Sequence, residues 1–259
     1  MSERPHPGKL GTLLLVPNTL DLGLAPGPLD EVLPQDVIRR AAGLAHWAAE
    51  DAKTARAFLK RVDAVVPLAQ PLQAIQITEL PRPRKGSREP VPAAEWQALL
   101  APALAGHDLG LISEAGLPAV ADPGAALVAA AHAAGVPVLP LSGPSSLLMA
   151  LSASGLNGQS FAFVGYLPQD AAPRTARIRE LEVLSRRLGQ TQLLIETPYR
   201  NASLLAALLE SLAPATRLSV SVGLTTPSAF TRSATVSSWR QQPITLPDRV
   251  PAVFALLAG

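Results

Sequence analysis

The feature that most constrains the fold is the stretch from Leu109 to Ser146. It contains two short apolar runs, Leu109–Ile112 and Val136–Leu141, and a loop rich in glycine and proline follows each of them. Short apolar runs bounded by turn residues predict buried parallel strands. The alanine-rich segment Ala125–Ala134 between them predicts a crossover helix. We expect the two strand tips to be neighbours. Because ligands bind at the carboxyl edge of open α/β sheets, the two loops are candidates for a functional site.

The rest of the chain repeats this alternation of strands and helices. Apolar runs predict strands at Thr12–Val16, Leu44–Ala48, Ile75–Ile77, Phe161–Val164, Gln192–Glu196, Arg217–Val222 and Pro251–Leu257, and an edge element at Ser228–Thr235. Helices are expected at Pro34–Ala42, after Asp51, at Ala93–Leu104, at Ser146–Ser154, at Arg174–Leu188 and at Ala202–Leu212. Pro92 is expected at the first position of its helix. The fold class is therefore α/β, with an N-terminal domain at residues 10–141 that has a mostly parallel sheet and a C-terminal domain at 142–259 that has a mixed sheet.

Composition narrows the functional classes. The 259 residues carry a net charge of +2, which gives no strong general attraction to nucleic acid. There is no cysteine, so disulfides and thiol chemistry are excluded, and a cytoplasmic location is expected. The segment Met1–Lys9 is expected to be a disordered lead without a signal peptide, and no run has the length of a membrane span.

Common catalytic signatures are missing. Neither the dinucleotide-binding nor the phosphate-binding glycine motif is present, and there is no serine nucleophile elbow. The 4 histidines are scattered without ligand spacing, so no metal site is expected. What remains is the pair of loops, in which Gly116 and Gly124 permit close approach of the backbone to a ligand. The alternative is that these are ordinary loops that connect a strand to a helix, because the spacing of glycine and proline alone does not distinguish the two.

Several segments, taken together, resemble one family. They read LISEAGLPAVADPG, then PLSGPSSLLMALSASGL, then FAFVGYLP, then LLIETPYRN, in that order along the chain. They resemble the successive motifs of the tetrapyrrole methylase superfamily, and most closely its ribose 2′-O-methyltransferase branch, which modifies a cytidine of small-subunit ribosomal RNA. The segments GTLLLVPNTLDLG and AAEDAKTARAFL resemble two further parts of that branch, so the resemblance spans residues 11–258.

The resemblance implies a homodimer of two-domain subunits with S-adenosyl-L-methionine in an interdomain cleft. It implies ribosomal RNA or the small ribosomal subunit as the partner. Cofactor contacts carried over from the family fall on Val16, Pro17, Gly116, Leu117, Val120, Ser145, Ser146, Ile195, Gly223 and Pro251.

The chain departs from the family pattern at Thr19–Asp21, Gln169–Ala172 and Gly223–Thr226. These departures lie mainly in the substrate-binding part. Two alternatives therefore stay open beside an RNA methyltransferase. One is a methylase acting on a carbon of a corrin or porphyrin, and the other is a catalytically silent paralogue that binds cofactor or a partner.

A ribose hydroxyl is a poor nucleophile, so a carboxylate that accepts its proton is expected. Glu50 and Asp51 are the first candidates, because they follow a predicted strand at the carboxyl edge of the sheet. The alternative for Asp51 is a helix cap, and for Glu50 a solvated side chain. Glu114 and Asp122 are second candidates, although Asp122 precedes a proline and is equally suited to fixing the loop.

Basic residues are candidates for contacts to RNA phosphates. They form a loop from Arg82 to Arg88 and a helical face with Arg174, Arg177, Arg179, Arg186 and Arg187. Solvated positive faces are the alternative, because Glu180 and Glu182 lie within the second set. The tryptophans Trp47, Trp96 and Trp239 are expected in the core or an interface rather than as platforms for base stacking.

Overall fold

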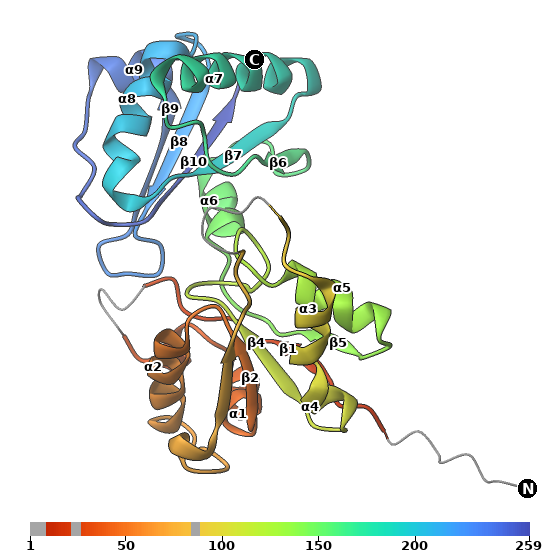
Figure 1. Ribbon diagram of the computed structural model, residues 1–259. Coiled ribbons are helices and arrows are strands. Elements are labelled where there is room, and N and C mark those ends of the chain that lie inside the picture. The colour runs from red at the N-terminus through yellow and green to blue at the C-terminus, as the bar shows by residue number, and fades with distance from the viewer. Residues whose placement is uncertain (1–8, 22–26, 84–88) are drawn as a thin grey trace, which may run out of the picture. The chain divides into compact units, whose positions relative to one another are not determined.

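The computed structural model describes residues 9–21, 27–83 and 89–259. The chain divides into two units, Met1–Pro144 and Ser145–Gly259, each with its own sheet and core (Figure 1). Residues 1–8 of the expected lead and 84–88 of the basic loop lie outside the described residues. Among the described residues, no helix combines the length and the apolar character that a membrane span requires.

The first unit is built on a parallel sheet of five strands in the order β3-β2-β4-β1-β5. Its strands are β1 (Leu13–Leu15), β2 (His46–Ala49), β3 (Gln76–Glu79), β4 (Leu109–Ile112) and β5 (Val138–Pro140). Since all of them run the same way, the loops that follow them meet at one edge. The predicted α/β class with a mostly parallel first sheet is confirmed.

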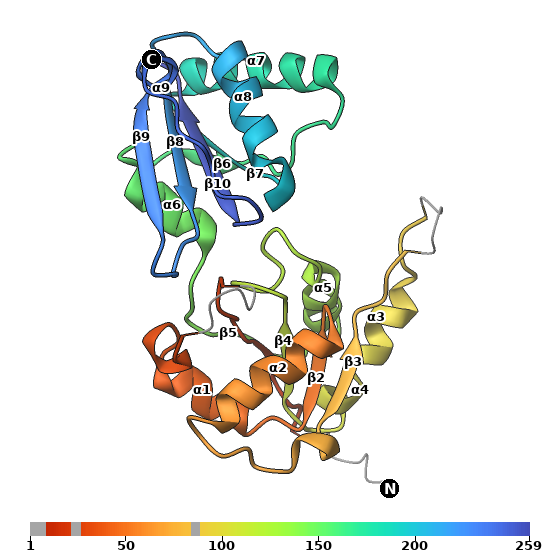
Figure 2. The same ribbon diagram turned by 90° about the vertical axis from the view of Figure 1, so that its left-hand side faces the viewer.

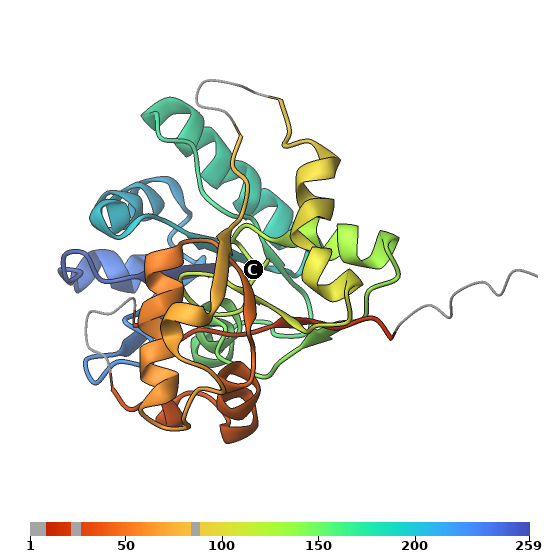
Figure 3. The same ribbon diagram turned by 60° about the horizontal axis from the view of Figure 1, so that its bottom comes forward.

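Helices cover both faces of this sheet, as parallel strands require. Helices α1 (Gln35–Ala42) and α2 (Ala52–Asp63) pack on one face with Leu14 and Trp47. Helices α3 (Ala93–Leu99), α4 (Ala101–Leu104) and α5 (Ala125–Ala133) cover the other face with Leu13 and Ala48 (Figure 3). Successive residues of β1 and β2 thus enter different cores, because side chains alternate along a strand.

Two predictions for the first unit are wrong in detail. The expected helix Ala93–Leu104 is split at Leu100, because Pro102 cannot continue the hydrogen bonding of α3. Pro92 is the N-cap of α3 rather than its first residue.

The strands β4 and β5, expected to be neighbours, are separated by β1. Strand β5 is at the edge of the sheet, and Leu139 and Pro140 are exposed, so the expectation of a fully buried strand there is wrong.

The second unit is built on a mixed sheet in the order β6-β7-β10-β8-β9. Its strands are β6 (Phe161–Phe163), β7 (Thr191–Ile195), β8 (Arg217–Val222), β9 (Phe230–Thr235) and β10 (Ala252–Leu257). Only β6 and β7 are parallel neighbours, and the other pairs are antiparallel. The mixed sheet and the edge position of the 228–235 segment agree with the sequence prediction.

Helices again cover both faces of the second sheet. Helix α6 (Ser146–Ser154) packs on one face, while α7 (Ala171–Leu188), α8 (Asn201–Ser211) and α9 (Val236–Gln241) pack on the other (Figure 2). Helix α6 has the expected bounds and ends at Gly155, whose φ of 63° supplies a left-handed stop. Short 3₁₀ turns lie at η1 (Leu29–Glu31), η2 (Leu72–Ala74) and η3 (Pro198–Arg200).

Candidate functional site

The two loops predicted to form a site, after β4 and β5, meet the loop after β1 at the carboxyl edge of the first sheet. Because β1 pairs with both β4 and β5, the loop after β1 lies between the loops after those strands. Gly143 packs so closely on the ring of Pro17 that a Cβ atom there would overlap it. A Cβ atom at Gly116 would lie 3.2 Å from the Leu20 side chain and 3.5 Å from the carbonyl oxygen of Pro144. Glycine is needed at both positions for the loops to touch.

Asn18, for which the sequence predicts no role, links two of these loops through hydrogen bonds. Its backbone N–H donates to the Gly116 carbonyl at 2.9 Å, and the Gly116 N–H donates back to the Asn18 carbonyl at 3.2 Å. The buried side-chain amide donates to the carbonyls of Ser113 and Glu114, at 3.2 and 3.0 Å. The only local signal was an asparagine after a proline, and its partners are distant in sequence.

Arg61 of α2 holds the segment that departs from the family pattern. Its guanidinium donates to the Thr19 hydroxyl at 2.9 Å and to the Asp21 carboxylate at 3.2 Å. Thr19 and Asp21 are both buried. A charged group at such a depth is costly unless it is paired, so these residues serve to fix the loop after β1.

The loop after β4 has an unusual backbone. Gly116, Ala119, Ala121 and Gly124 have φ angles of 67°, 64°, 66° and 130°. Non-glycine residues rarely adopt this region, and such strain concentrates at functional sites. Of the predicted contact residues, Leu117 accepts a hydrogen bond from the Val120 N–H at 3.4 Å, and Val120 is 44% exposed.

Glu50 and Asp51 follow β2 but have different surroundings. The Glu50 carboxylate is half-buried and accepts from the Glu114 N–H at 3.1 Å. Burial raises the pKa of Glu50, against the effect of that hydrogen bond. The Asp51 carboxylate is the N-cap of α2 and accepts from the Thr54 N–H at 2.6 Å, which lowers the pKa of Asp51. The capping alternative therefore describes Asp51, and its catalytic role stays a prediction.

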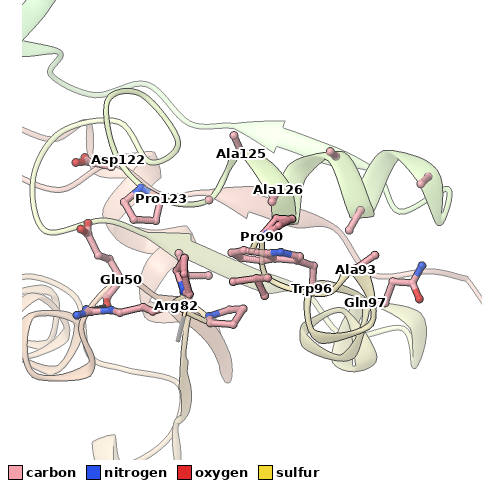
Figure 4. Close-up of a pocket in the computed structure, with 18 residues that line it drawn as sticks. Glu50, Arg82, Pro90, Ala93, Trp96, Gln97, Asp122, Pro123, Ala125 and Ala126 are labelled. Carbon is pink, nitrogen blue, oxygen red and sulfur yellow. Dashed lines mark hydrogen bonds between the residues drawn. The ribbon is translucent and has the colours of Figure 1, made fainter. Parts of the chain in front are cut away.

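Asp122 lies beside Glu50. Burial, and then the charges of Glu50 and Glu114, raise the pKa of Asp122 to about 7. In the described part of the chain its side chain has no hydrogen-bond partner. Figure 4 shows the Glu50 and Asp122 carboxyl groups at the same end of a cavity, with the Arg82 side chain near Glu50. Arg82 donates to the Glu50 carbonyl at 2.9 Å.

The cavity has a volume of about 730 Å³ and belongs wholly to the first unit. Its walls come from the loops after β3 and β4, from the face of α3 that carries Trp96, and from one face of α5 along its whole length. Most of the lining is proline and alanine, so the carboxyl end is polar and the remainder apolar (Figure 4). Trp47 and Trp239 are 1% and 0% exposed, as expected for core residues, and Trp96 is half-buried, packing against the core while also lining this cavity.

In the second unit, Ser145 and Ser146 begin α6. The Ser145 hydroxyl accepts from the Leu148 N–H at 3.5 Å and so caps the helix. Ser146 is the first residue of the helix. A helix start of this kind presents backbone N–H groups toward a ligand.

The other predicted contacts of the second unit also lie together. Ile195 pairs with Val253 of β10, and the Gly223 N–H donates to the Pro251 carbonyl at 2.9 Å. Ile195, Gly223 and Pro251 therefore share one edge of the second sheet. The structure thus brings Pro17 and Gly116 together in the first unit through the loops after β1 and β4, and Ile195, Gly223 and Pro251 in the second.

The turn after β8 replaces the family's usual residues with Gly223–Thr226. The Thr226 hydroxyl donates to the Gly223 carbonyl at 2.6 Å, which closes the turn. Thr225 has a φ of 68°, and its buried hydroxyl has no hydrogen-bond partner in the described part of the chain. A β-branched residue in this region is strained.

The basic face of α7 is partly used within the protein. Arg177 pairs with Glu180 at 2.7 Å, Arg174 donates to the Gln169 carbonyl at 3.3 Å, and Arg186 donates to the Gly259 carbonyl at 2.8 Å. Glu182 is buried and accepts from the Ala213 N–H at 2.8 Å. Among the described residues, no group of His, Cys, Asp and Glu side chains is placed to hold a metal ion.

A family model for the tetrapyrrole (corrin/porphyrin) methylases matches residues 45–238. Two curated relatives are both called ribosomal RNA small subunit methyltransferase I. The protein from Vibrio cholerae is 40% identical over 116 residues, which is 45% of this chain and 39% of the relative. The protein from Mycobacterium bovis is 34% identical over 170 residues, which is 64% of this chain and 52% of the relative. The matches thus span about half or less of the length of these relatives.

The structure of the methyltransferase CobJ is similar in fold, with a TM-score of 0.56 and 16% identity. It covers 97% of this chain and 100% of the other.

Proposed function

We propose, from the premise that the chain belongs to the tetrapyrrole methylase family, that it is an S-adenosyl-L-methionine-dependent methyltransferase acting on a ribose 2′-hydroxyl of ribosomal RNA. The single observation that carries this proposal is the convergence of the loops after β1, β4 and β5, with Asn18 joining the first two and Gly143 packed on Pro17. The names of the relatives add the substrate class.

The residues present suit the cofactor. A nucleoside needs hydrogen-bonding groups in an otherwise apolar site. The buried hydroxyls of Ser113, directly after β4, and Thr225, in the turn after β8, have no hydrogen-bond partner within the described residues. We infer that Pro17, Leu117 and Val120 of the first unit and Ile195, Gly223 and Pro251 of the second hold the cofactor. That one cofactor contacts both sets rests on the family resemblance.

When bound, S-adenosyl-L-methionine supplies the methyl group from its sulfonium. The protein must then hold the ribose oxygen in line and remove its proton. We propose that the carboxylate of Glu50 accepts the proton of the ribose hydroxyl, because its raised pKa makes it a stronger base than an exposed glutamate. The Glu114 N–H and the Arg82 guanidinium keep Glu50 in place. Asp51 contributes by starting α2, directly after Glu50.

A methylase acting on a tetrapyrrole carbon is the second candidate. The largely apolar cavity of about 730 Å³ favours it, since a macrocycle needs apolar walls. The first proposal has two further parts. We propose that the protein is a cytoplasmic homodimer that acts on the small ribosomal subunit. We also propose that Arg82 and the α7 arginines contact RNA phosphates.

Two measurements test the function. Calorimetry with S-adenosylhomocysteine asks whether the chain binds cofactor, and the absence of binding would refute the proposal. Methyl incorporation is then compared for unmodified small ribosomal subunits, free ribosomal RNA and uroporphyrinogen. Incorporation into RNA is expected. Incorporation into the tetrapyrrole alone would support the second candidate, and binding without transfer would indicate a silent paralogue.

A further inference from the structure

A second cavity of the first unit lies at the edge of the sheet opposite the loops described above. Its volume is about 600 Å³, within the range of roughly 300–1,000 Å³ typical of small-molecule sites. Most of its lining comes from three segments, 9–12, 39–46 and 106–108, which lead into β1, β2 and β4. Because these segments precede parallel strands, they meet at the amino edge of the sheet. This amino-edge cavity shares no lining residue with the cavity that contains Glu50, and the reaction proposed above does not use it.

Basic side chains are prominent in the amino-edge cavity. Lys9, Arg39 and Arg40 line it, and Asp108 is the only carboxylate among the described residues that do so. Arg40 and Arg39 also pair with Asp36 of the same helix, at 2.8 and 3.9 Å, but all three side chains are largely exposed. Exposed ion pairs contribute little to stability, so the two guanidinium groups can turn toward an anion at low cost.

Two histidines also line this cavity. His46 starts β2 and pairs in register with Leu109, so His107 lies beside it, with the ring centroids 5.4 Å apart. Among the described residues neither imidazole has a hydrogen-bond partner, and the Nδ1 atom of His46 is buried without one. Buried polar atoms are usually hydrogen-bonded, so an unpaired one points to a partner from outside the fold.

We propose that the amino-edge cavity binds phosphate groups of the RNA backbone through Arg39 and Arg40, with Lys9 and the two histidines as further donors. The proposal rests on the proposed function for the presence of RNA. A guanidinium group presents a fork of N–H donors that matches two oxygens of one phosphate, and an ammonium group acts as a point charge beside it. The Asp108 carboxylate opposes an anion, but it is held in place by the Thr12 N–H, which donates to it at 2.8 Å.

The charge balance favours a phosphodiester over a free nucleotide. The three cations are offset by two carboxylates, Asp36 and Asp108, which leaves one net positive charge before the imidazoles are counted. A phosphodiester carries one negative charge. A nucleoside diphosphate or triphosphate carries more, and it is commonly held by a glycine-rich loop at a helix start. The sequence contains neither of the common motifs of that kind.

The position of the cavity suits a substrate that is larger than one nucleotide. Strands β2 and β4 have four residues each, so the two edges of the sheet are about 13 Å apart, at roughly 3.3 Å per residue. An RNA that follows one side of this unit can therefore contact both edges. Phosphate contacts fix the orientation of a nucleic acid without reading its sequence, so this cavity contributes affinity and not base preference.

The experiment measures binding of labelled small-subunit ribosomal RNA to the full chain by filter binding. Gly43→Glu places a carboxylate at the cavity, because Gly43 lines it. A Cβ atom there makes only ordinary contacts, 3.6 and 3.8 Å from the carbonyl oxygens of Arg40 and Arg39. Gly43→Gln is the matched control, since it adds a side chain of the same size without the charge. Gly43→Glu should bind RNA about tenfold more weakly than Gly43→Gln, in the range of one lost contact to a charged group.

A second pair of variants removes a cation instead. Arg39→Gln changes the cavity, and its control Lys60→Gln removes the same charge from an exposed position of α2 that does not line the cavity. In salt between about 50 and 200 mM, Arg39→Gln should reduce the slope of log affinity against log salt by about 0.7–0.9, the value for one phosphate. It should raise the KM for RNA about tenfold and leave kcat unchanged, because the contact is the same before and during the reaction. Binding of S-adenosylhomocysteine should also stay unchanged.

The outcomes distinguish this proposal from the function on which it rests. Equal RNA affinity and salt slope in Arg39→Gln and Lys60→Gln, or equal affinity in Gly43→Glu and Gly43→Gln, overturns the amino-edge site, while continued methyl transfer keeps the proposed function. Calorimetry with inorganic phosphate and adenosine monophosphate tests the other source of the same chemistry. Binding of either that Arg39→Gln abolishes, at unchanged RNA affinity, assigns the cavity to a free phosphate compound and overturns the RNA contact. Failure of the unmodified chain to bind RNA overturns the proposed function and this contact together.

Discussion

The assignment of separate roles to two adjacent carboxylates can be tested directly. Asp51 caps α2 through its Oδ1 atom, which accepts from the Thr54 N–H at 2.6 Å. Glu50 has its carboxylate at the cavity and is held by the Glu114 N–H at 3.1 Å. Asp51→Ala should therefore act on stability, and Glu50→Gln on the chemical step.

The magnitudes follow from these contacts. Loss of an N-cap costs about 1 kcal/mol, so Asp51→Ala should lower the Tm by roughly 2–4 °C. Asp51→Asn is the matched control, because asparagine caps a helix as well as aspartate does, and it should keep both Tm and kcat. In Glu50→Gln the amide oxygen still accepts from Glu114, so the fold is kept. Loss of the general base should lower kcat by about 10²–10⁴-fold.

The assay combines thermal unfolding with methyl incorporation into small ribosomal subunits under saturating cofactor. Binding of S-adenosylhomocysteine to each variant shows whether the cofactor site is intact. If Asp51→Asn lost a hundredfold in kcat at unchanged Tm, while Glu50→Gln kept its turnover, Asp51 would be the base and Glu50 a structural residue, and the reasoning would be refuted.

Three further predictions concern the backbone at Gly143 and Thr225 and the titration of Asp122. Gly143→Ala should weaken binding of S-adenosylhomocysteine and lower the free energy of unfolding by about 1–3 kcal/mol, because its Cβ would overlap Pro17; calorimetry and urea unfolding measure both, and unchanged values would contradict the close packing. Thr225→Gly should raise the stability of the second unit by about 1 kcal/mol by relieving the φ of 68°, which urea unfolding would show, and a loss of stability would refute the strain. The fold raises the pKa of Asp122 from 3.8 to about 7, so the folded state favours the protonated carboxyl group. The resulting contribution to the free energy of unfolding is fully present below pH 3.8 and is lost as the pH rises through about 7. Relative to Asp122→Asn, the unmodified chain should therefore become less stable between about pH 4 and 7 in urea unfolding, and parallel pH profiles would rule out the shift.

Much of the fold was predictable because its signals are local. The strand Leu109–Ile112 and the helix Ser146–Ser154 have the bounds that the sequence predicts. The strand order was not predictable in the same way. The sequence places β4 and β5 next to each other along the chain, but β1, from the start of the chain, pairs between them. Periodicity identifies strands and not their partners.

The same limit applies to the candidate site. The loops were identified from their glycines and prolines, but Asn18 and Arg61 were not, since they act on residues far along the chain. Trp96 was expected in a core or interface, because an aromatic residue in a helix is usually buried. The structure shows it half-buried, packed on the core and also lining the cavity with the α5 alanines, a contact that only the tertiary arrangement reveals.

The edge strand β5 has a further implication for the behaviour of the protein in solution. It has three residues and ends at Pro140, whereas the Pro137 carbonyl before it faces inward and accepts from the Leu13 N–H. Proline has no N–H to offer, so this margin of the sheet is a poor template for a strand from another molecule. A parallel sheet that assembles slowly from distant segments is exposed to such mispairing while it folds. Pro140, three residues before Gly143, should thus disfavour pairing of this edge with a strand from another molecule.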